Sequence, residues 1–430
     1  MKQDIKLQYA LDDSPPLWEL ILYGLQWLAI SIPTIIIIGR VVAGIETTEP
    51  LAQVAYIQKA FFVTGIVLLV QILWGHRLPL ILGPAAVLLV SIAASSGSNV
   101  DSIYTAIAIG GAVLALTGIT GIFGRLLGIF TPRVVASILL LIALTLTPTI
   151  MGLVTASNAG VAAQANLIFS LVFVLVLFIA ARYLKGIWKA TLIVWAIIAG
   201  TLVYKLFFPA YAGTMSFDSA AVGYQFLFSG ISLSVDWGVI LAFLISFLAL
   251  SINDLGSIQS VGEMIKPDGM EKRISRGTFV TGLGNILSGL MGVIGPVDFS
   301  MSPGVIATSR CASRFTLIPT GIGLLVLSFL PAVISFAGTI PSAVIGSVLV
   351  YIMCSQISAG LIMAYGSGDF SFDNGLTVGL PLMLGVIISF LPGAVTAGFP
   401  PTLRPILGNG FVVGVVAVLV MEHLIIKGRP

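Results

Sequence analysis

Charged residues are scarce in this sequence. Asp, Glu, Lys and Arg make up 9% of the 430 residues, whereas 58% are hydrophobic and the mean hydropathy is +1.11. A soluble chain of this length needs far more charge to cover its surface, so the composition excludes an ordinary globular protein and indicates an all-α polytopic membrane protein in a lipid bilayer. The net charge is only +3, and no basic run is interleaved with aromatic residues, which argues against a nucleic-acid partner.

Cysteine and enzyme motifs are also lacking. The two cysteines, Cys311 and Cys354, lie in apolar surroundings, so a disulfide framework or a thiolate metal site is not expected. The sequence has no His/Cys cluster, aspartate-rich metal motif, G-x-S-x-G or P-loop, so we expect neither an enzyme nor a cofactor. Glycine pairs such as Gly282 and Gly284 lie inside apolar segments and predict close helix packing. Without an ATP site, any transport would have to use an ion gradient.

Residues 1–16 have no apolar core and no cleavage-like end, which predicts a short soluble tail in the cytoplasm, not a signal peptide. The remainder predicts fourteen membrane-spanning segments without a soluble domain between them. Their approximate ranges are 17–39, 54–74, 78–95, 103–123, 134–154, 165–183, 188–208, 238–257, 279–294, 303–311, 316–337, 343–365, 376–391 and 406–426.

The distribution of Lys and Arg supports an even number of spans. If both termini are cytoplasmic, only four of the 20 cations fall on the outside, at Arg40, Lys59, Lys205 and Arg404. This asymmetry is the one that the positive-inside rule predicts, and an odd number of spans would scramble it. We therefore expect a multi-pass protein of the inner (plasma) membrane, with Arg310 and Arg314 among its cytoplasmic anchors.

Two of the segments are short and interrupted. Residues 77–87 read R-L-P-L-I-L-G-P-A-A-V and residues 297–306 read V-D-F-S-M-S-P-G-V-I. They are third in each set of seven, and because seven is odd the two sets have opposite orientations, as in an inverted repeat. We expect the extended stretches to pair in mid-membrane and the two half-helices to point their N-termini, with the N–H groups of Ala85 (just past Pro84) and Gly304, at a ligand.

Polar residues gather near these breaks. Asn253 and Ser257 are one helical turn apart, and an amide is able to bind the edge of a base, although it serves equally in a hydrogen bond between helices. Asp254 is either a proton-coupling group or a helix-end acid that faces the cytoplasmic water, and its place on the flank of Asn253 and Ser257 also allows a contact with a partner helix. Asp298 is either a second coupling group or a residue at the outer water interface, and Ser302 lines the second half-helix. His76, in a turn beside Arg77, is expected to be a solvated loop or interface residue, with a proton relay as the alternative.

These motifs resemble those of the nucleobase–ascorbate transporter (nucleobase:cation symporter-2) family, which contains the uracil and xanthine permeases. The resemblance rests on P-P-L-W-E-L-I-L-Y-G-L-Q-W, L-P-L-I-L-G-P-A-A, N-D-L-G-S-I-Q-S and M-S-P-G-V-I-A-T-S-R, in span order along the whole chain. In the last motif, Gly304 and Arg310 keep the family's spacing. The sequence departs from the family where Asn253 replaces a common substrate-binding glutamate, and where Met301 and Ser302 replace an acid or Gln followed by Asn.

The resemblance implies core and gate domains, a homodimer formed through the gates, and an elevator-like movement of core against gate. The core would contain residues 17–128 and 238–340, and the gate 129–237 and 341–430. The implied function is symport of a uracil- or xanthine-class nucleobase with a proton, or with Na⁺. The substrate-binding candidates are Asn253, Ser257, Gly304, Ser302, Met301, Ala85, Pro84 and Gln26, and the proton-coupling candidates are Asp254 and Asp298.

Two other functions remain open from the sequence. One is an anion carrier of the sulfate-permease type, which shares this layout. The dipoles of the half-helices suit an anion, but Asp254 and Asp298 would repel it. The other is a membrane receptor that binds a nucleobase without moving it.

Overall fold

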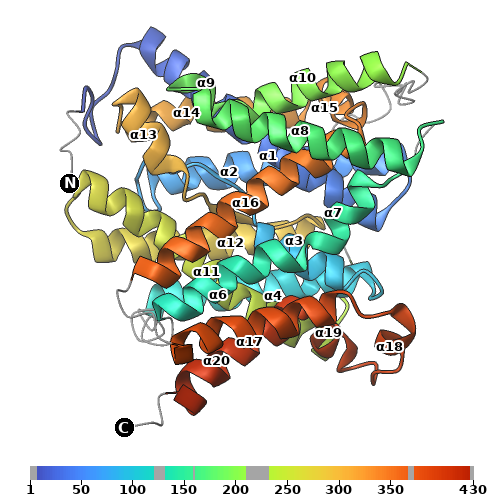
Figure 1. Ribbon diagram of the computed structural model, residues 1–430. Coiled ribbons are helices and arrows are strands. Elements are labelled where there is room, and N and C mark those ends of the chain that lie inside the picture. The colour runs from blue at the N-terminus through green and yellow to red at the C-terminus, as the bar shows by residue number, and fades with distance from the viewer. Residues whose placement is uncertain (1–6, 121–130, 158–159, 210–231, 367–371, 427–430) are drawn as a thin grey trace.

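The computed structural model describes residues 7–120, 131–157, 160–209, 232–366 and 372–426. The predicted boundary between the first two domains, at residues 128–129, lies outside these ranges. The protein is mostly helical (78%), and the long helices run side by side (Figure 1). In its first half the elements are α1 (Leu17–Glu46), α2 (Pro50–Leu73), β1 (Leu82–Pro84), α3 (Ala86–Ala94), α4 (Val100–Thr120), α6 (Pro132–Thr145), α7 (Thr147–Val154), α8 (Ala163–Tyr183), α9 (Ile187–Ala190) and α10 (Leu192–Phe207).

The second half begins with a long helix that carries Asn253, Asp254 and Ser257. Its elements are α11 (Trp237–Ile265), α12 (Met270–Met291), β2 (Pro296–Asp298), α13 (Ser302–Ser309), a 3-10 turn η4 (Arg314–Thr316), α14 (Leu317–Ser328), α15 (Pro331–Gly338), α16 (Ser342–Gly366), α17 (Phe372–Ser389), α18 (Gly393–Ala397), α19 (Arg404–Leu407), α20 (Gly410–Val420) and a π-helical turn η5 (Met421–Ile426).

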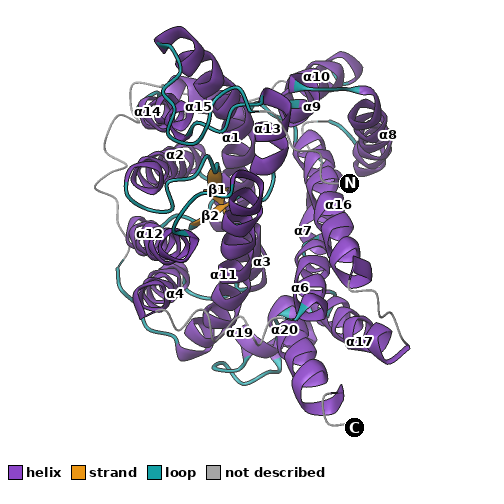
Figure 2. Cartoon of the chain, turned by 90° about the vertical axis from the view of Figure 1, so that its left-hand side faces the viewer, coloured by secondary structure: helices purple, strands orange, loops and turns teal. Residues whose placement is uncertain are grey.

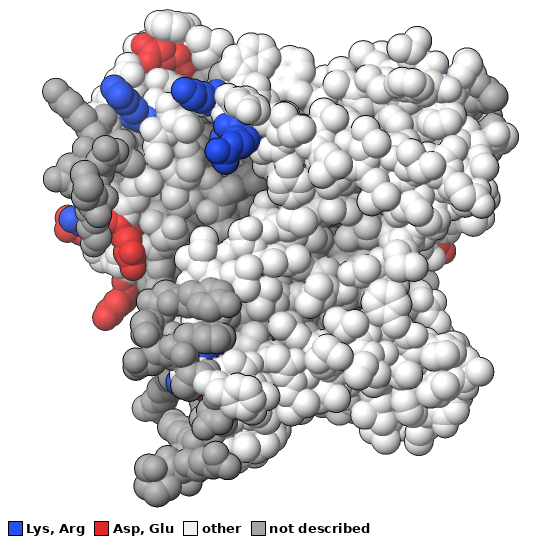
Figure 3. Space-filling model, viewed as in Figure 1, with Lys and Arg blue, Asp and Glu red and all other residues white. Residues whose placement is uncertain are grey.

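Seven helices of the described chain are long and apolar enough to span a membrane. Large apolar side chains remain exposed along them, for example Leu171, Leu175 and Ile179 on α8. The face of the molecule drawn in Figure 3 is uncharged over most of its area, with charged residues gathered towards its left end. This surface is suited to lipid, so the chain is a multi-pass membrane protein.

The helices form two groups (Figure 2). In one, α1–α4, α11, α12 and α14 surround the two short strands; in the other, α6, α8, α16, α17 and α20 pack together. α11 joins the groups, because it contacts α3 and α4 on one side and α19 and α20 on the other. The strands therefore lie inside the first group, close to the side that faces the second.

Glycines allow the tightest helix pair, α4 with α12, to form. A Cβ atom at Gly282 would lie 2.4 Å from the backbone N of Ala115, and one at Gly111 would lie 2.7 Å from the N of Ile286. A Cβ at Gly284 would meet Val67 at 2.7 Å. The predicted packing role of the Gly282–Gly284 pair is confirmed, since any larger residue would push the helix backbones apart.

Three local predictions differ from the structure. The predicted span 316–337 is not one straight helix, because its two parts, α14 and α15, meet at 82° next to Pro331, which has no backbone N–H. α12 starts at Met270, well before residue 279, since charged residues form its first turns outside the apolar window. The predicted tail is partly bound: Gln8 N donates to Arg310 O (2.8 Å), and Arg314 Nε donates to Asp12 Oδ1 (2.7 Å).

Candidate functional site

The two interrupted segments pair as predicted, and we call the place where β1 (Leu82–Pro84) and β2 (Pro296–Asp298) meet the crossing. β1 and β2 form an antiparallel pair in which Leu82 faces Asp298 and Pro84 faces Pro296. Further bonds extend the pair at both ends: Ala85 N donates to Gly295 O (2.9 Å), and Phe299 N donates to Ile81 O (2.9 Å). Extended backbone inside a membrane protein needs such partners because lipid provides none. The prediction that spans 3 and 10 are discontinuous and pair with each other is confirmed.

The backbone donors at the crossing differ from the expected ones. The N–H of Ala85 is engaged by Gly295, and the N–H of Gly304 donates to Met301 O at 3.0 Å. The prediction that these two groups are unpaired is therefore wrong. Instead, the N–H groups of Ala86 and Val87, at the first two positions of α3, have no acceptor within the described part of the chain. This half-helix end retains two donors and the positive end of its dipole.

Two carboxyl groups are buried behind the crossing. Asp254 of α11 is fully buried and Asp298 at the end of β2 is 1% exposed. Asp254 Oδ1 accepts hydrogen bonds from Thr281 Oγ1 (3.1 Å) and from the backbone N of Asp298 (3.3 Å). Asp254 Oδ2 and both carboxyl oxygens of Asp298 have no hydrogen-bond partner among the described residues. The alternatives that placed these acids in water are wrong: Asp298 is not at the outer water interface, and Asp254 does not face the cytoplasmic water but contacts Thr281 of the neighbouring helix α12.

His76 lies against this pair, where the sequence predicted a solvated loop residue. Its side chain is fully buried, and Nε2 lies 3.5 Å from Asp298 Oδ2. Nδ1 accepts a hydrogen bond from Leu78 N (2.9 Å), which assigns the proton of a neutral ring to Nε2, the atom that faces Asp298. The prediction was wrong because the turn folds inwards: Arg77 adopts a left-handed conformation (φ 54°), and its N–H donates to Gln71 O (3.0 Å).

A chain of hydrogen bonds joins the histidine turn to Asp254. Gln71 Oε1 accepts from His76 N (3.3 Å), while Gln71 Nε2 donates to Thr281 Oγ1 (3.0 Å) and to Gly277 O (2.9 Å). Thr281 in turn donates to Asp254. Gln71 and Thr281 were missed by the sequence analysis, although a glutamine inside an otherwise apolar span was a usable signal. We name His76, Asp254 and Asp298 the buried acid–histidine cluster.

The remaining predicted residues fall into two sets. Asn253 and Gln26 are half-buried, Met301 is 41% exposed, and Gly304 is exposed with no atom near its missing side chain. The inner set is buried and already bonded. Ser302 Oγ accepts from Ile81 N (3.1 Å) and donates to Phe299 O (2.9 Å).

Ser257 belongs to the same inner set, together with Pro84 and Ala85 of the crossing. Its hydroxyl lies 2.8 Å from Asn253 O and 2.9 Å from Asp298 O, so it links the helix that carries Asn253 to β2. The outer residues have surface available for a ligand, whereas the inner ones hold the crossing and connect it to the buried acid–histidine cluster.

The site lies in a chain with clear relatives. The family described as "Permease family" (Xan_ur_permease) matches residues 18–394. The chain is 25% identical to the uric acid permease PucJ of Bacillus subtilis (90% of this chain, 86% of the relative) and 26% identical to the xanthine permease of Bacillus subtilis (92% and 89%). It is 23% identical to the xanthine permease XanP of Escherichia coli (98% and 95%).

Solved structures share the fold. The transmembrane domain of a cyanobacterium bicarbonate transporter, BicA, superposes with a TM-score of 0.62 at 16% identity, covering 89% of this chain and 98% of that one. SLC26A9 gives 0.60 at 13% identity, covering 94% and 66%. The family and the relatives are permeases, not enzymes, and the match over most of the chain shows that this protein belongs to the permease family of the uracil and xanthine permeases.

Proposed function

We propose that this protein is a secondary active transporter that moves a uracil- or xanthine-class nucleobase across the inner membrane together with a proton. Family membership and relatives named as uric acid and xanthine permeases support the substrate class. The crossing of β1 and β2 supports a binding site in mid-membrane, because interrupted helices expose polar backbone there.

The observation that carries the proton coupling is the buried acid–histidine cluster. With His76 neutral, as the hydrogen bond from Leu78 N to its Nδ1 requires, and both acids ionised, the cluster has a formal charge of −2, and one proton lowers it to −1. An unpaired ionised carboxylate at this depth is costly, by several kcal/mol. A proton that binds to the cluster therefore removes part of this cost and stabilises the β1–β2 crossing beside it. A Na⁺ ion would lower the negative charge by the same amount, and uptake measured in sodium-free buffer separates the two ions.

A substrate bound to Asn253 of α11 would lie next to this cluster, because Asp254 is the following residue. The amide of Asn253 offers one donor and one acceptor face, which matches the edge of a pyrimidine or purine base. The free N–H groups of Ala86 and Val87 add donors from α3, and Met301 and Gly304 leave open surface at the start of α13. Ser257 Oγ donates to the backbone carbonyls of Asn253 and Asp298, so it ties α11 to the end of β2, and a shift of β2 on protonation of Asp298 would be passed to the helix that carries Asn253.

The movement follows from the proposed domains. Residues 17–128 and 238–340 would form a core that carries the substrate, and residues 129–237 and 341–430 would form a gate that stays fixed in a homodimer. The core would slide against the gate like an elevator, with α11 at the boundary. We place both termini in the cytoplasm, on the basis of the asymmetry of Lys and Arg.

The substrate is tested by counterflow in proteoliposomes loaded with unlabelled base. We expect labelled xanthine, uric acid or uracil to accumulate transiently, and Asn253→Ala to raise the half-saturating concentration about tenfold or more, because a lost base-edge pair leaves polar groups unpaired. Glu49→Gln, at an exposed acid before α2, should transport normally. If no nucleobase competes for uptake, the proposal is wrong.

The second candidate is an anion carrier, which the free N–H groups at the start of α3 also suit. Two of the solved structures with this fold, BicA and murine Slc26a9, are named as a bicarbonate transporter and an anion transporter, but at 16% and 14% identity the likeness concerns the fold alone. Uptake of labelled sulfate or bicarbonate that nucleobases do not inhibit would favour this candidate. Saturable nucleobase binding without counterflow would favour the receptor.

A further inference from the structure

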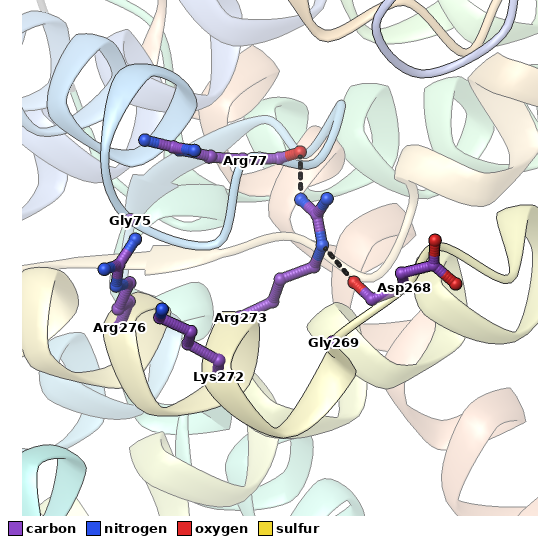
Figure 4. A pocket seen from close by; sticks show the side chains of 7 residues that line it. All are labelled: Gly75, Arg77, Asp268, Gly269, Lys272, Arg273 and Arg276. Atoms are coloured by element: carbon purple, nitrogen blue, oxygen red, sulfur yellow. Dashed lines mark hydrogen bonds between the residues drawn. The ribbon is translucent and has the colours of Figure 1, made fainter.

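A charged pocket lies away from the crossing, where the turn after α2 meets the start of α12. Its volume is about 170 Å³, and Figure 4 shows its lining. Lys272 and Arg276 project from α12 towards the Gly75 turn, while the Arg273 guanidinium lies between Arg77 and Asp268. The lining residues are Gly75, Arg77, Asp268, Gly269, Lys272, Arg273 and Arg276.

The pocket has an uncompensated positive charge. Four of its side chains are cationic and only Asp268 is acidic. Among the described residues, none of the four cations has a carboxylate oxygen within 4.0 Å. Even the contact between Arg273 and Asp268 uses the backbone carbonyl of the acid (3.0 Å), not its carboxylate. Four cations around a single acid that forms an ion pair with none of them repel one another, so an anion bound here would be stabilised.

Part of the pocket is rigidly built. Arg273 donates to the carbonyl oxygens of His76 (3.1 Å), Arg77 (3.0 Å) and Asp268, and so joins the two loops that form the walls. α12 starts after Gly269, a left-handed residue (φ 68°), and no side chain caps its first N–H groups. The positive end of a 22-residue helix therefore adds to the four side-chain charges.

Trp74 places the pocket relative to the bilayer. It follows the last residue of the apolar helix α2, is 43% exposed, and lies under Arg276, whose Cζ is 5.3 Å from the ring centroid. Tryptophan and arginine at the end of a membrane span lie at the level of the lipid headgroups. The anions that are concentrated at this depth are phosphodiesters of anionic phospholipids.

We propose that this pocket binds the phosphate of an anionic phospholipid headgroup, with Lys272 and Arg276 as its ligands. Within the described residues these two side chains donate no hydrogen bond to backbone, whereas Arg77 and Arg273 donate to Leu73, His76 and Asp268 and have structural roles. Binding does not depend on which substrate is carried. Because Arg273 also holds the carbonyl of His76, a bound lipid would stiffen the turn that places His76 against Asp298.

The experiment measures lipid binding to the full chain purified in a neutral detergent. Phosphatidylglycerol and phosphatidylcholine with the same acyl chains are titrated, and the melting temperature and the number of retained lipids (by native mass spectrometry) are recorded. We expect phosphatidylglycerol alone to raise the melting temperature. The double variant Lys272→Gln, Arg276→Gln should need about tenfold or more lipid for the same rise in melting temperature, because both cations that attract the anionic headgroup are lost.

The matched control is Lys185→Gln with Lys189→Gln, which removes one exposed cation from the α8–α9 connection and one from α9. This control should respond to phosphatidylglycerol like the unmodified protein. If the double variant is unstable, Lys272→Gln alone serves, because this side chain is exposed and its loss removes no hydrogen bond seen in the structure.

Two results would overturn the proposal. One is an unchanged phosphatidylglycerol response in the pocket variants. The other is equal stabilisation by inorganic phosphate or glycerol 3-phosphate at millimolar concentration, which would make the ligand a free phosphate instead of a lipid. Addition of salt at about 0.5 M should weaken the lipid effect, since the pocket is open to solvent and screening acts on it.

Discussion

Thr281→Val removes one hydroxyl from the middle of the hydrogen-bond chain and keeps the side-chain shape. In the structure, Thr281 Oγ1 accepts from Gln71 Nε2 (3.0 Å) and donates to Asp254 Oδ1 (3.1 Å). After the substitution, Gln71 keeps its bond to Gly277 O (2.9 Å), so it is not orphaned. Asp254 Oδ1 keeps only the longer contact with Asp298 N (3.3 Å). The substitution therefore acts mainly on Asp254, which loses the shorter of the two hydrogen bonds that its Oδ1 accepts.

The size of this cost depends on the charge of Asp254. A hydrogen bond to an ionised group is worth about 1.5–3 kcal/mol, and one to a neutral group about 0.5–1.5 kcal/mol. The variant therefore disfavours the ionised form of Asp254 by about 1 kcal/mol more than the neutral form. Since about 1.4 kcal/mol corresponds to one pH unit, the pH of half-maximal uptake should move upwards by about 0.7 units if uptake requires a protonated cluster.

The assay combines thermal unfolding in detergent with initial uptake rates from about pH 5 to pH 9. Thr278→Val is the matched control, because Thr278 lies one turn earlier on α12, is 1% exposed, and its hydroxyl has no partner among the described residues. This control should be neutral or slightly stabilising, and its pH profile should stay in place. The reasoning is refuted if the two variants behave alike in both measurements.

Two further predictions concern the fold that holds the site. Gly282→Ala should lower the free energy of unfolding by about 1–3 kcal/mol, because the new Cβ meets the backbone of Ala115 at 2.4 Å. Gly379→Ala, with open space around it, should be neutral or stabilising in the same thermal assay. Equal stability of the two variants would contradict the packing argument. Ser302→Ala leaves the N–H of Ile81 without its partner and should lower the free energy of unfolding by about 1–3 kcal/mol. Ser335→Ala, at a half-buried serine of α15 whose hydrogen bond to Ala332 O is exposed, should change it by less than about 0.5 kcal/mol. A tolerated Ser302→Ala would show that the hydroxyl does not hold the crossing.

The crossing was predictable from the sequence because its signals are local. Pro84, Pro303 and the neighbouring glycines interrupt apolar runs, and an interrupted span in lipid must find backbone partners. The packing role of Gly282 was predictable for a similar reason. In both cases the relevant chemistry lies within a few residues of the signal.

The acid–histidine cluster was only half predictable. Asp254 and Asp298 were visible as acids beside apolar segments, but His76 is separated from Asp298 by more than two hundred residues, and its burial depends on the left-handed turn at Arg77. The sequence predicted an unpaired backbone N–H at Ala85, but Ala85 pairs with Gly295 across the crossing. Within the described residues, the unpaired N–H groups of α3 are those of Ala86 and Val87. Such details depend on three-dimensional packing, which periodicity and composition do not encode.

The most direct test of the proposed coupling compares the unmodified protein with Asp298→Asn in proteoliposomes that contain a pH-sensitive dye. In sodium-free buffer, an inward proton gradient should accelerate net uptake of the transported base and should move protons with it in the unmodified protein. Asp298→Asn should retain counterflow exchange but lose both the response to the gradient and the proton movement. Equal gradient-driven uptake by the two proteins, or uptake that requires Na⁺, would contradict the account.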